Sequence, residues 1–301
     1  MFSKIQFKPM ILCTLALILA VLIIHFMPAL TIIVAFFVTL PGIILWYRSI
    51  PSFGLSSFIT IIVATMTGSL FIMSFMILAL VASALIGHLL QLRASKERIL
   101  YVVTLTISVL TLSMMMLLQS IKQLPYAHEL LQPYQAVVDQ TIALQDLDAT
   151  SQEVLNASVQ QLAIQLPGLI VVMLTIFMFI TLAMIFPILR KFKIATPVYR
   201  PLYLWQMKRA IFILYAIALL VGILSEPATT VNSISVNFQI VLGFLLVIQG
   251  LSFIHYLCAM KRLHRSLTIF LVMLGIVFYP LTRLIGLLDI GLNLKNMINK
   301  R

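Results

Sequence analysis

Charged side chains are scarce in this sequence of 301 residues, because Asp, Glu, Lys and Arg together make up only 9% of it. A soluble domain carries about 25% charged residues. Hydrophobic residues instead make up 62%, and the mean hydropathy is +1.14. So few charges cannot cover a water-facing surface, whereas a lipid-facing surface needs almost none. The shortage excludes an ordinary soluble protein and predicts an all-α polytopic transmembrane helical bundle in a lipid bilayer.

Acidic residues are the scarcer kind of charge, with 8 of them against 20 basic residues. The resulting net charge of +12 would suggest nucleic acid in a soluble protein. Here the basic residues lie in short clusters between apolar runs, which is typical of cytoplasmic loops facing anionic lipid. We therefore expect no nucleic acid partner. The same bias predicts a multi-pass protein with a cytoplasmic N-terminus.

Motifs for catalysis, metals and cofactors are lacking as well. The two cysteines, Cys13 and Cys258, lie far apart in apolar segments, and no two of the five histidines share a helical spacing of three or four. The sequence contains no HExxH, GxSxG, GxGxxG or P-loop motif. We expect no catalytic residue, no metal site and no cofactor, and an intramembrane enzyme is the least favoured hypothesis. If this protein moves solute uphill, another chain must supply the ATPase.

Long apolar runs are what the sequence has in abundance. Phe53–Leu92 holds no charged residue and is too long for one span, so we divide it at its most polar point, Thr65–Ser69. Pro280 kinks the last run or makes it re-entrant, which leaves eight or nine crossings, and the side of the C-terminus, open. The predicted helices are 9–25, 29–47, the two halves of 53–92, 99–121, 166–189, 210–224, 235–260 and 267–288.

One segment between these runs is different. Residues 122–165 hold five of the eight acidic residues and have apolar residues at helical spacing, which predicts an external amphipathic helical hairpin. Thr150 and Glu153 have the spacing of a capping box, with Thr150 as the N-cap. The chain thus divides into an N-terminal five-helix membrane region (1–121), this hairpin (122–165) and a C-terminal membrane region of three to four helices (166–301).

Polar side chains inside apolar helices are costly unless they are paired, so they are candidate ligand-binding residues. Gln249 lies near the middle of its helix, with Ser252 on nearly the same face, and Asn237 and Gln239 lie near the outer end. The alternative for each is an interhelical hydrogen bond without a ligand.

Small residues at four-residue spacing allow close helix packing. Ala79, Ser83 and Gly87 form one such row, and Gly243 and Gly250 share a face by heptad spacing. Packing within the chain is one interpretation, and docking of a partner is the other. The candidate partner-docking residues are Ala16, Ala20, Arg190, Lys191 and Lys193.

Several short motifs of the C-terminal half resemble the YybS-like family of uncharacterised bacterial multi-spanning membrane proteins. They are Pro197–Pro201 with Trp205, then Asn237, Gln249–Phe253 and Gly286–Asp289. The order of parts is similar to that family along nearly the whole chain. The resemblance implies the bacterial cytoplasmic membrane, with 122–165 outside, and a basic residue soon after Asp289, where Lys295 is the nearest. It supplies no catalytic residues.

The N-terminal part is faintly similar to the substrate-binding S components of energy-coupling-factor transporters. Those proteins dock a coupling subunit through an Ala-x3-Ala face, a spacing that Ala16 and Ala20 share. This resemblance implies a transport component that binds a small apolar or amphipathic molecule and relies on an ATPase or coupling subunit for energy. The alternative is a non-transporting scaffold or regulator that docks proteins through its basic cytoplasmic loops. Nothing in the sequence indicates the oligomeric state.

Overall fold

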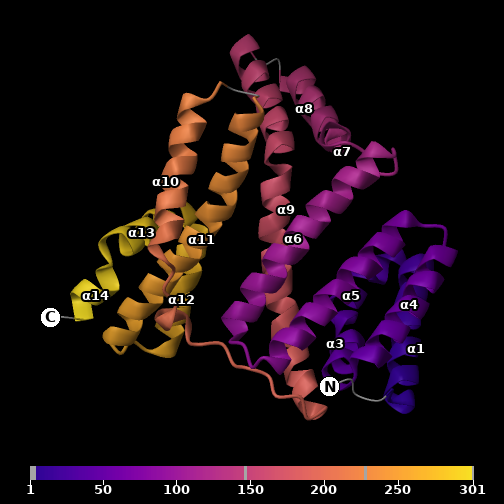
Figure 1. The fold of residues 1–301 in the computed structure, drawn as a ribbon. Helices are drawn as coiled ribbons and strands as arrows, with labels where there is room; N and C mark the ends of the chain where they lie inside the picture. Colours follow the sequence, from indigo (N-terminus) through magenta and orange to yellow (C-terminus); the bar gives the residue numbers. More distant parts are fainter. Residues whose placement is uncertain (1–4, 146–147, 227–228, 300–301) are drawn as a thin grey trace. The chain divides into compact units, whose positions relative to one another are not determined.

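A computed structural model describes residues 5–145, 148–226 and 229–299 of the protein. Throughout these ranges the regular structure is helical, with no β-strand, which confirms the predicted all-α fold (Figure 1). The chain divides into two compact units. Unit 1 comprises Met1–Pro125 with Met173–Tyr199, and unit 2 comprises Tyr126–Val172 with Arg200–Arg301. The predicted regions 1–121, 122–165 and 166–301 were defined by their position relative to the membrane. The division into compact units does not test that position, so the three regions stay a prediction.

Unit 1 contains the first six apolar helices and the second part of a long helix shared with unit 2. Its core consists of two clusters of buried aliphatic side chains, centred on Ile43, Ile86 and Phe186 in one and on Leu17, Val21 and Met76 in the other. The elements are α1 (Phe7–Phe26), the short η1 (Pro28–Leu30), α2 (Thr31–Phe37), α3 (Thr39–Arg48), α4 (Ile50–Met66), α5 (Leu70–Gln91) and α6 (Lys96–Ser120).

The predicted division of the uncharged run between α4 and α5 is confirmed. Gly68 adopts a positive φ of 71° between the two helices, a conformation that glycine tolerates best. The Ser69 side chain then accepts a hydrogen bond from the backbone N–H of Ile72 and caps α5. Polar residues at this point therefore end one helix and start the next.

The small-residue row on α5 packs within the chain. A Cβ added to Gly42 of α3 would lie 2.6 Å from the Cβ of Ser83, and one added to Gly87 would lie 2.8 Å from Trp46. The Ser83 hydroxyl also donates to the Thr39 carbonyl at 3.1 Å. Small side chains thus let α3 and α5 approach closely, which is the intramolecular interpretation of this row.

A break in the second apolar segment separates α2 from α3 at Val38. Pro41 explains its position, because a proline ring clashes with the carbonyl four residues earlier and has no N–H to donate to it. That carbonyl belongs to Phe37, the last residue of α2. Val38 itself keeps helical dihedral angles (φ −59°, ψ −28°), so the chain continues in a helical path from Pro28 to Arg48 in which the proline removes a hydrogen bond.

Unit 2 begins with α7 (Ala127–Leu130) and α8 (Gln132–Gln145), followed by the start of α9 (Ala149–Lys191). The predicted N-cap Thr150 is wrong, since α9 begins at Ala149 and Asp148 precedes it. Hydrogen bonds from Ser151 and Thr150 hold the pKa of Asp148 below its usual value, which is the pattern of an N-cap carboxylate. Aspartate is a better N-cap residue than threonine. Asp148 also lies directly before the first residue of α9, which is the N-cap position.

Helix α9 continues through residue 166, where the sequence predicted a separate membrane helix. Pro167 would be expected to open the helix here. Asn237 fills the opening: its amide donates to the Ile164 carbonyl at 2.8 Å, and its Oδ1 accepts from the Gly168 N–H. A side chain from another helix thus satisfies the backbone groups that the proline frees, and the helix stays continuous.

The remaining helices of unit 2 differ in length, and several of them pack around a small apolar core that includes the fully buried Leu246. They are η2 (Leu202–Leu204), α10 (Arg209–Leu224), α11 (Thr230–Met260), α12 (Arg265–Val277), α13 (Tyr279–Leu292) and α14 (Leu294–Asn299). Helix α11 packs against α10, α12 and α13. Figure 1 shows α10 and α11 side by side, with α13 crossing α11.

Six helices of the described chain are long and apolar enough to span a membrane. Helices α12 and α13 pass the same test together but are bent by 102° at Phe278, and α4 and α10 are shorter apolar helices. Each of the nine predicted apolar segments thus corresponds to one of these features. The bend lies beside Pro280, as expected, and whether the pair crosses the membrane stays open.

Candidate functional site

Gln249, predicted as a candidate ligand-binding residue, lies at the centre of a buried polar network in unit 2. Its Nε2 donates to the Asp289 carboxylate at 2.5 Å, and its Oε1 accepts from the Met207 N–H at 3.0 Å. Gln249 and Asp289 are each 1% exposed. The side-chain amide therefore joins α11 to α13 and to the segment that follows η2.

Lys295 also belongs to this network, through both its backbone N–H and its side chain. Its backbone N–H donates to Asp289 at 3.1 Å, and its ammonium donates at 2.6 Å both to the Trp205 carbonyl and to the Ser252 hydroxyl. The Ser252 hydroxyl in turn donates to the Leu202 carbonyl at 2.6 Å. Lys295, the basic residue nearest after Asp289, thus contacts this carboxylate through its backbone N–H, while its ammonium holds the start of α14 against the 202–207 segment.

Burial lowers the pKa of Lys295, and the negative charge of Asp289 offsets part of this effect. A lysine with a lowered native pKa loses its proton earlier in the folded than in the unfolded protein. The free energy of unfolding should therefore rise as the pH is raised through the native pKa toward the ordinary value near 10.5. We expect thermal unfolding in detergent at pH 7–10.5 to show this rise in the wild type and not in Lys295→Met. Parallel pH profiles would contradict it.

Asn237 and Gln239, the other two candidate ligand-binding residues, lie away from this network. Asn237 bridges the opened turn of α9 described above. The Gln239 amide donates to the Ala218 carbonyl of α10 at 3.0 Å and to the Ser235 hydroxyl at 3.1 Å. The structure thus gives all four candidate ligand-binding residues of α11 hydrogen-bond partners within unit 2, and it does not bring the two pairs together. Their role in ligand binding stays a prediction.

The candidate partner-docking residues differ in accessibility. Ala16 is exposed on α1, whereas Ala20 is buried in the core of unit 1. Arg190, Lys191 and Lys193 are exposed at and just beyond the end of α9. The Ala-x3-Ala row is therefore only partly exposed, and the three basic side chains are exposed, with the Arg190 Nε donating to the Thr196 hydroxyl at 2.8 Å.

Lys96, predicted to lie in a loop, is instead a buried cation at the start of α6, with 7% of its surface exposed. Its ammonium lies 3.8 Å from the ring centre of Tyr199 and 4.9 Å from that of Phe186. Burial, with the charge of Glu97, raises the pKa of Tyr199. These cation–π contacts fix the 194–199 segment on unit 1, a role that sequence spacing does not reveal.

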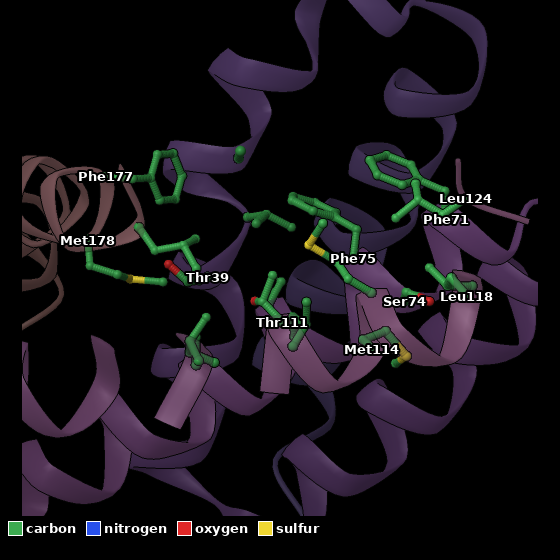
Figure 2. Close-up of a pocket in the computed structure, with 18 residues that line it drawn as sticks. Thr39, Phe71, Ser74, Phe75, Thr111, Met114, Leu118, Leu124, Phe177 and Met178 are labelled. Atoms are coloured by element: carbon green, nitrogen blue, oxygen red, sulfur yellow. The ribbon is translucent and has the colours of Figure 1, made fainter. Parts of the chain in front are cut away.

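The best-formed cavity of the described residues lies within unit 1 and has a volume of about 290 Å³. Helices α2, α3, α5, α6 and α9 all contribute to its walls (Figure 2). The cavity lies beside Val38, the residue between α2 and α3. Its lining includes Phe71 near the start of α5 and Leu118 near the end of α6. Aromatic rings and methionines form much of the lining: Phe71, Phe75, Phe177, Met114, Met115 and Met178.

Three hydroxyl groups in the cavity wall have no hydrogen-bond partner. They belong to Thr39, Ser74 and Thr111, and all three oxygens are buried. Some other helical hydroxyls of unit 1 donate to a carbonyl four residues earlier, as Thr14 does at 2.7 Å and Thr60 at 2.8 Å, whereas four hydroxyls outside the cavity lining also have no partner, those of Ser57, Thr104, Ser108 and Thr181. A buried hydroxyl without a partner is unfavourable. The three oxygens in the cavity wall are covered by neighbouring atoms, so the surface of the cavity itself is almost wholly apolar, and it is suited to a small apolar molecule.

This cavity was not predicted from the sequence. Serine and threonine are common in all the helices of unit 1, and their spacing does not distinguish the hydroxyls that bond to their own helix from those that do not. The one available signal was Pro41, because a proline removes a helical hydrogen bond within an apolar segment. No group of three or more His, Cys, Asp or Glu side chains suited to a metal ion occurs among the residues described.

Comparison with known proteins gives two matches. Residues 14–290 match a family described as predicted membrane protein (DUF2232). The chain is also 32% identical over 136 residues to the uncharacterized protein YybS of Bacillus subtilis (strain 168), an alignment that covers 44% of each protein. No solved structure matches. Because the family match extends over most of the chain and agrees with the apolar helices, this integral membrane protein belongs to the DUF2232 family of predicted membrane proteins.

Proposed function

We propose that this protein is a transport-related membrane component that binds a small apolar or amphipathic molecule in the cavity of unit 1. The observation that carries the proposal is the cavity itself, with its apolar lining of aromatic rings and methionines. Val38, at the turn where Pro41 removes a helical hydrogen bond, forms part of its wall.

Energy for transport comes, in this proposal, from a partner ATPase or coupling subunit, because the sequence has no P-loop. The exposed Ala16 and the basic end of α9 are the surfaces on which such a subunit would dock. The basic loops suggest that the N-terminus faces the cytoplasm of a bacterial cell. In that orientation the cavity occupies the outer half of the membrane.

A cavity-filling substitution tests the binding proposal. Ala82, in the cavity wall on α5, would direct an added ring into the space when replaced by phenylalanine. We expect a small molecule to copurify with the wild type, and at least tenfold less of it with Ala82→Phe, because the ring takes the volume that the ligand needs. Native mass spectrometry of the protein released from its own membrane measures the occupancy.

The matched control is Ala183→Phe, which adds the same ring to an exposed position of α9 outside the cavity. This variant should retain the ligand. If Ala82→Phe does not fold, Ala35→Phe on α2 also lines the cavity and is less buried. Equal occupancy in wild type and a folded cavity-filling variant, or no bound molecule in any of them, would refute the proposal.

A second candidate function is a non-transporting scaffold. The exposed Arg190, Lys191 and Lys193 at the end of α9 favour it, because they present positive charge to an acidic partner. A scaffold has no need of the cavity, so filling it would leave complex formation unchanged. Replacing the three basic residues by glutamine would then abolish capture of the partner, whereas a transport component would keep its ligand in that variant.

A further inference from the structure

Arg283, on α13 of unit 2, carries a positive charge that the rest of the described chain does not balance. Its guanidinium makes no hydrogen bond or ion pair with any described residue. Asp289 is the nearest acidic residue in the sequence, six positions later on the same helix. The Asp289 carboxylate instead accepts from the Gln249 amide and the Lys295 backbone N–H. Since arginine stays charged in proteins, the fold contains a cation without a counter-ion.

The guanidinium of Arg283 lies against α11. A Cβ added to Gly243 would lie 3.7 Å from Arg283 Nη1 and 3.9 Å from the ring of Tyr215, a buried residue of α10. Helix α13 contacts both α10 and α11, and Figure 1 shows it crossing α11. Glycine at position 243 leaves the surface of α11 open to the arginine side chain. The charged group thus lies among three apolar helices and is itself half-buried.

The depth of this contact follows from the length of α11, which is long and apolar enough to span a membrane. Gly243 lies about 20 Å from the first residue of this helix and about 26 Å from its last, at a rise of about 1.5 Å per residue. The hydrocarbon layer is about 30 Å thick. If α11 spans this layer, Gly243 lies inside it, and Nη1 of Arg283 lies there too. A cation at such a depth is costly unless it is paired, so it marks a binding site.

The chemistry of the group and of its surroundings defines the missing partner. A guanidinium is a planar fork that forms two parallel hydrogen bonds with a carboxylate or a phosphate. A small anion would lose its hydration on entering an apolar layer. An amphiphile already in the bilayer keeps its chain in lipid while its head group reaches the arginine. Exposed leucines on α13 offer that chain an apolar surface: Leu281, Leu284 and Leu288.

We propose that Arg283 binds the phosphate or carboxylate group of one anionic amphiphile taken from the membrane. The oxyanion supplies the counter-charge that the chain lacks, and the apolar chain lies along the exposed leucines of α13. This site lies in unit 2, separate from the cavity of unit 1, and it does not depend on the proposed function.

Thermal unfolding of the delipidated full-length protein in dodecyl maltoside, an uncharged detergent, tests the proposal. The probes are dioctanoylphosphatidylglycerol, dodecanoate, dioctanoylglycerol, which lacks the phosphate, and inorganic phosphate. We expect at least one of the two anionic amphiphiles to raise the melting temperature by about 4 °C at saturation, because a ligand that binds only the folded state stabilises it. Dioctanoylglycerol and inorganic phosphate should leave it unchanged.

The decisive variant is Arg283→Met, which removes the charge and keeps most of the apolar stem. It should lose the rise with the anionic amphiphile. Without amphiphile it should melt no lower than the wild type, because the substitution breaks no hydrogen bond or ion pair within the described chain. Arg209→Gln is the matched control, since Arg209 is an exposed arginine at the start of α10 in the same unit, and it should keep the rise. If Arg283→Met does not fold, Arg283→Lys replaces it and should bind about tenfold more weakly, because lysine lacks the planar fork.

Several results would overturn the proposal. They are no rise with either anionic amphiphile, an equal rise with dioctanoylglycerol, and a rise that persists in Arg283→Met or disappears equally in Arg209→Gln. An equal rise with inorganic phosphate would make a soluble anion the ligand and refute the membrane source. A marked loss of stability in amphiphile-free Arg283→Met would assign the arginine a structural role instead. Ala82→Phe, in the cavity of unit 1, should keep the rise, so the two proposals stand or fall separately.

Discussion

Replacing Gly250 by alanine should lower the free energy of unfolding by about 3 kcal/mol, the upper range for overpacking a close contact. A Cβ at this position would overlap the Thr282 carbonyl oxygen and lie 2.8 Å from the Thr282 Cγ2. Gly286 faces α11 in the same way, since its added Cβ would overlap the Leu246 carbonyl oxygen. Backbone is the obstacle in both cases, so α11 and α13 would have to separate.

The expected consequence extends to the polar network, because Gln249 and Asp289 lie next to this contact on α11 and α13. Thermal unfolding in detergent, followed by circular dichroism, measures the loss. Gly243→Ala is the matched control on the same helix, since the nearest atom to its added Cβ is 3.5 Å away in the Arg283 side chain. An equal effect of the two substitutions would show that close helix approach at Gly250 does not stabilise the fold.

Asp289→Ala should lower the free energy of unfolding by about as much as Gly250→Ala does, but by a different mechanism. The substitution leaves the Gln249 amide and the Lys295 backbone N–H without their acceptor. Each buried donor left without a partner costs about 1–3 kcal/mol. We therefore expect a loss of about 3 kcal/mol. Asp139→Ala is the control, because Asp139 is an exposed carboxylate on α8, and it should change stability by less than about 0.5 kcal/mol.

A double variant tests whether the network acts as a unit. Gln249→Leu alone leaves the Asp289 carboxylate and the Met207 N–H without partners. Combining it with Asp289→Leu removes both members of the short contact, and the loss should be smaller than the sum of the two single losses. Strictly additive losses would mean that the hydrogen bond between these side chains contributes nothing to the fold.

Much of the architecture was predictable because lipid imposes simple requirements. Only a helix satisfies its backbone hydrogen bonds within one segment in the hydrocarbon layer, so uncharged runs such as Phe53–Leu92 had to form helices. Proline and glycine then fixed their interruptions, at Gly68 between α4 and α5 and beside Pro280 between α12 and α13. Pro167 is the exception, because Asn237 from a distant part of the chain restores the interrupted helix.

The candidate sites were less predictable, since identical residue types have different surroundings. Gly243 and Gly250 are equivalent by heptad spacing, yet only Gly250 meets a neighbouring backbone. Gln249 was recognisable as an unusual residue in an apolar helix, but its partner Asp289 lies 40 positions away. The hydroxyls of the cavity had no distinguishing signal at all.

Composition and hydropathy by themselves determined that this chain is a membrane-embedded helical protein, because so few charges leave lipid as the only suitable surroundings. The order of the helices and most of their ends followed from local residue types. Tertiary structure alone decided which polar side chains find partners and which do not. Hydrogen bonding within a membrane depends on the few atoms within about 3 Å of each group, and those atoms come from distant parts of the chain.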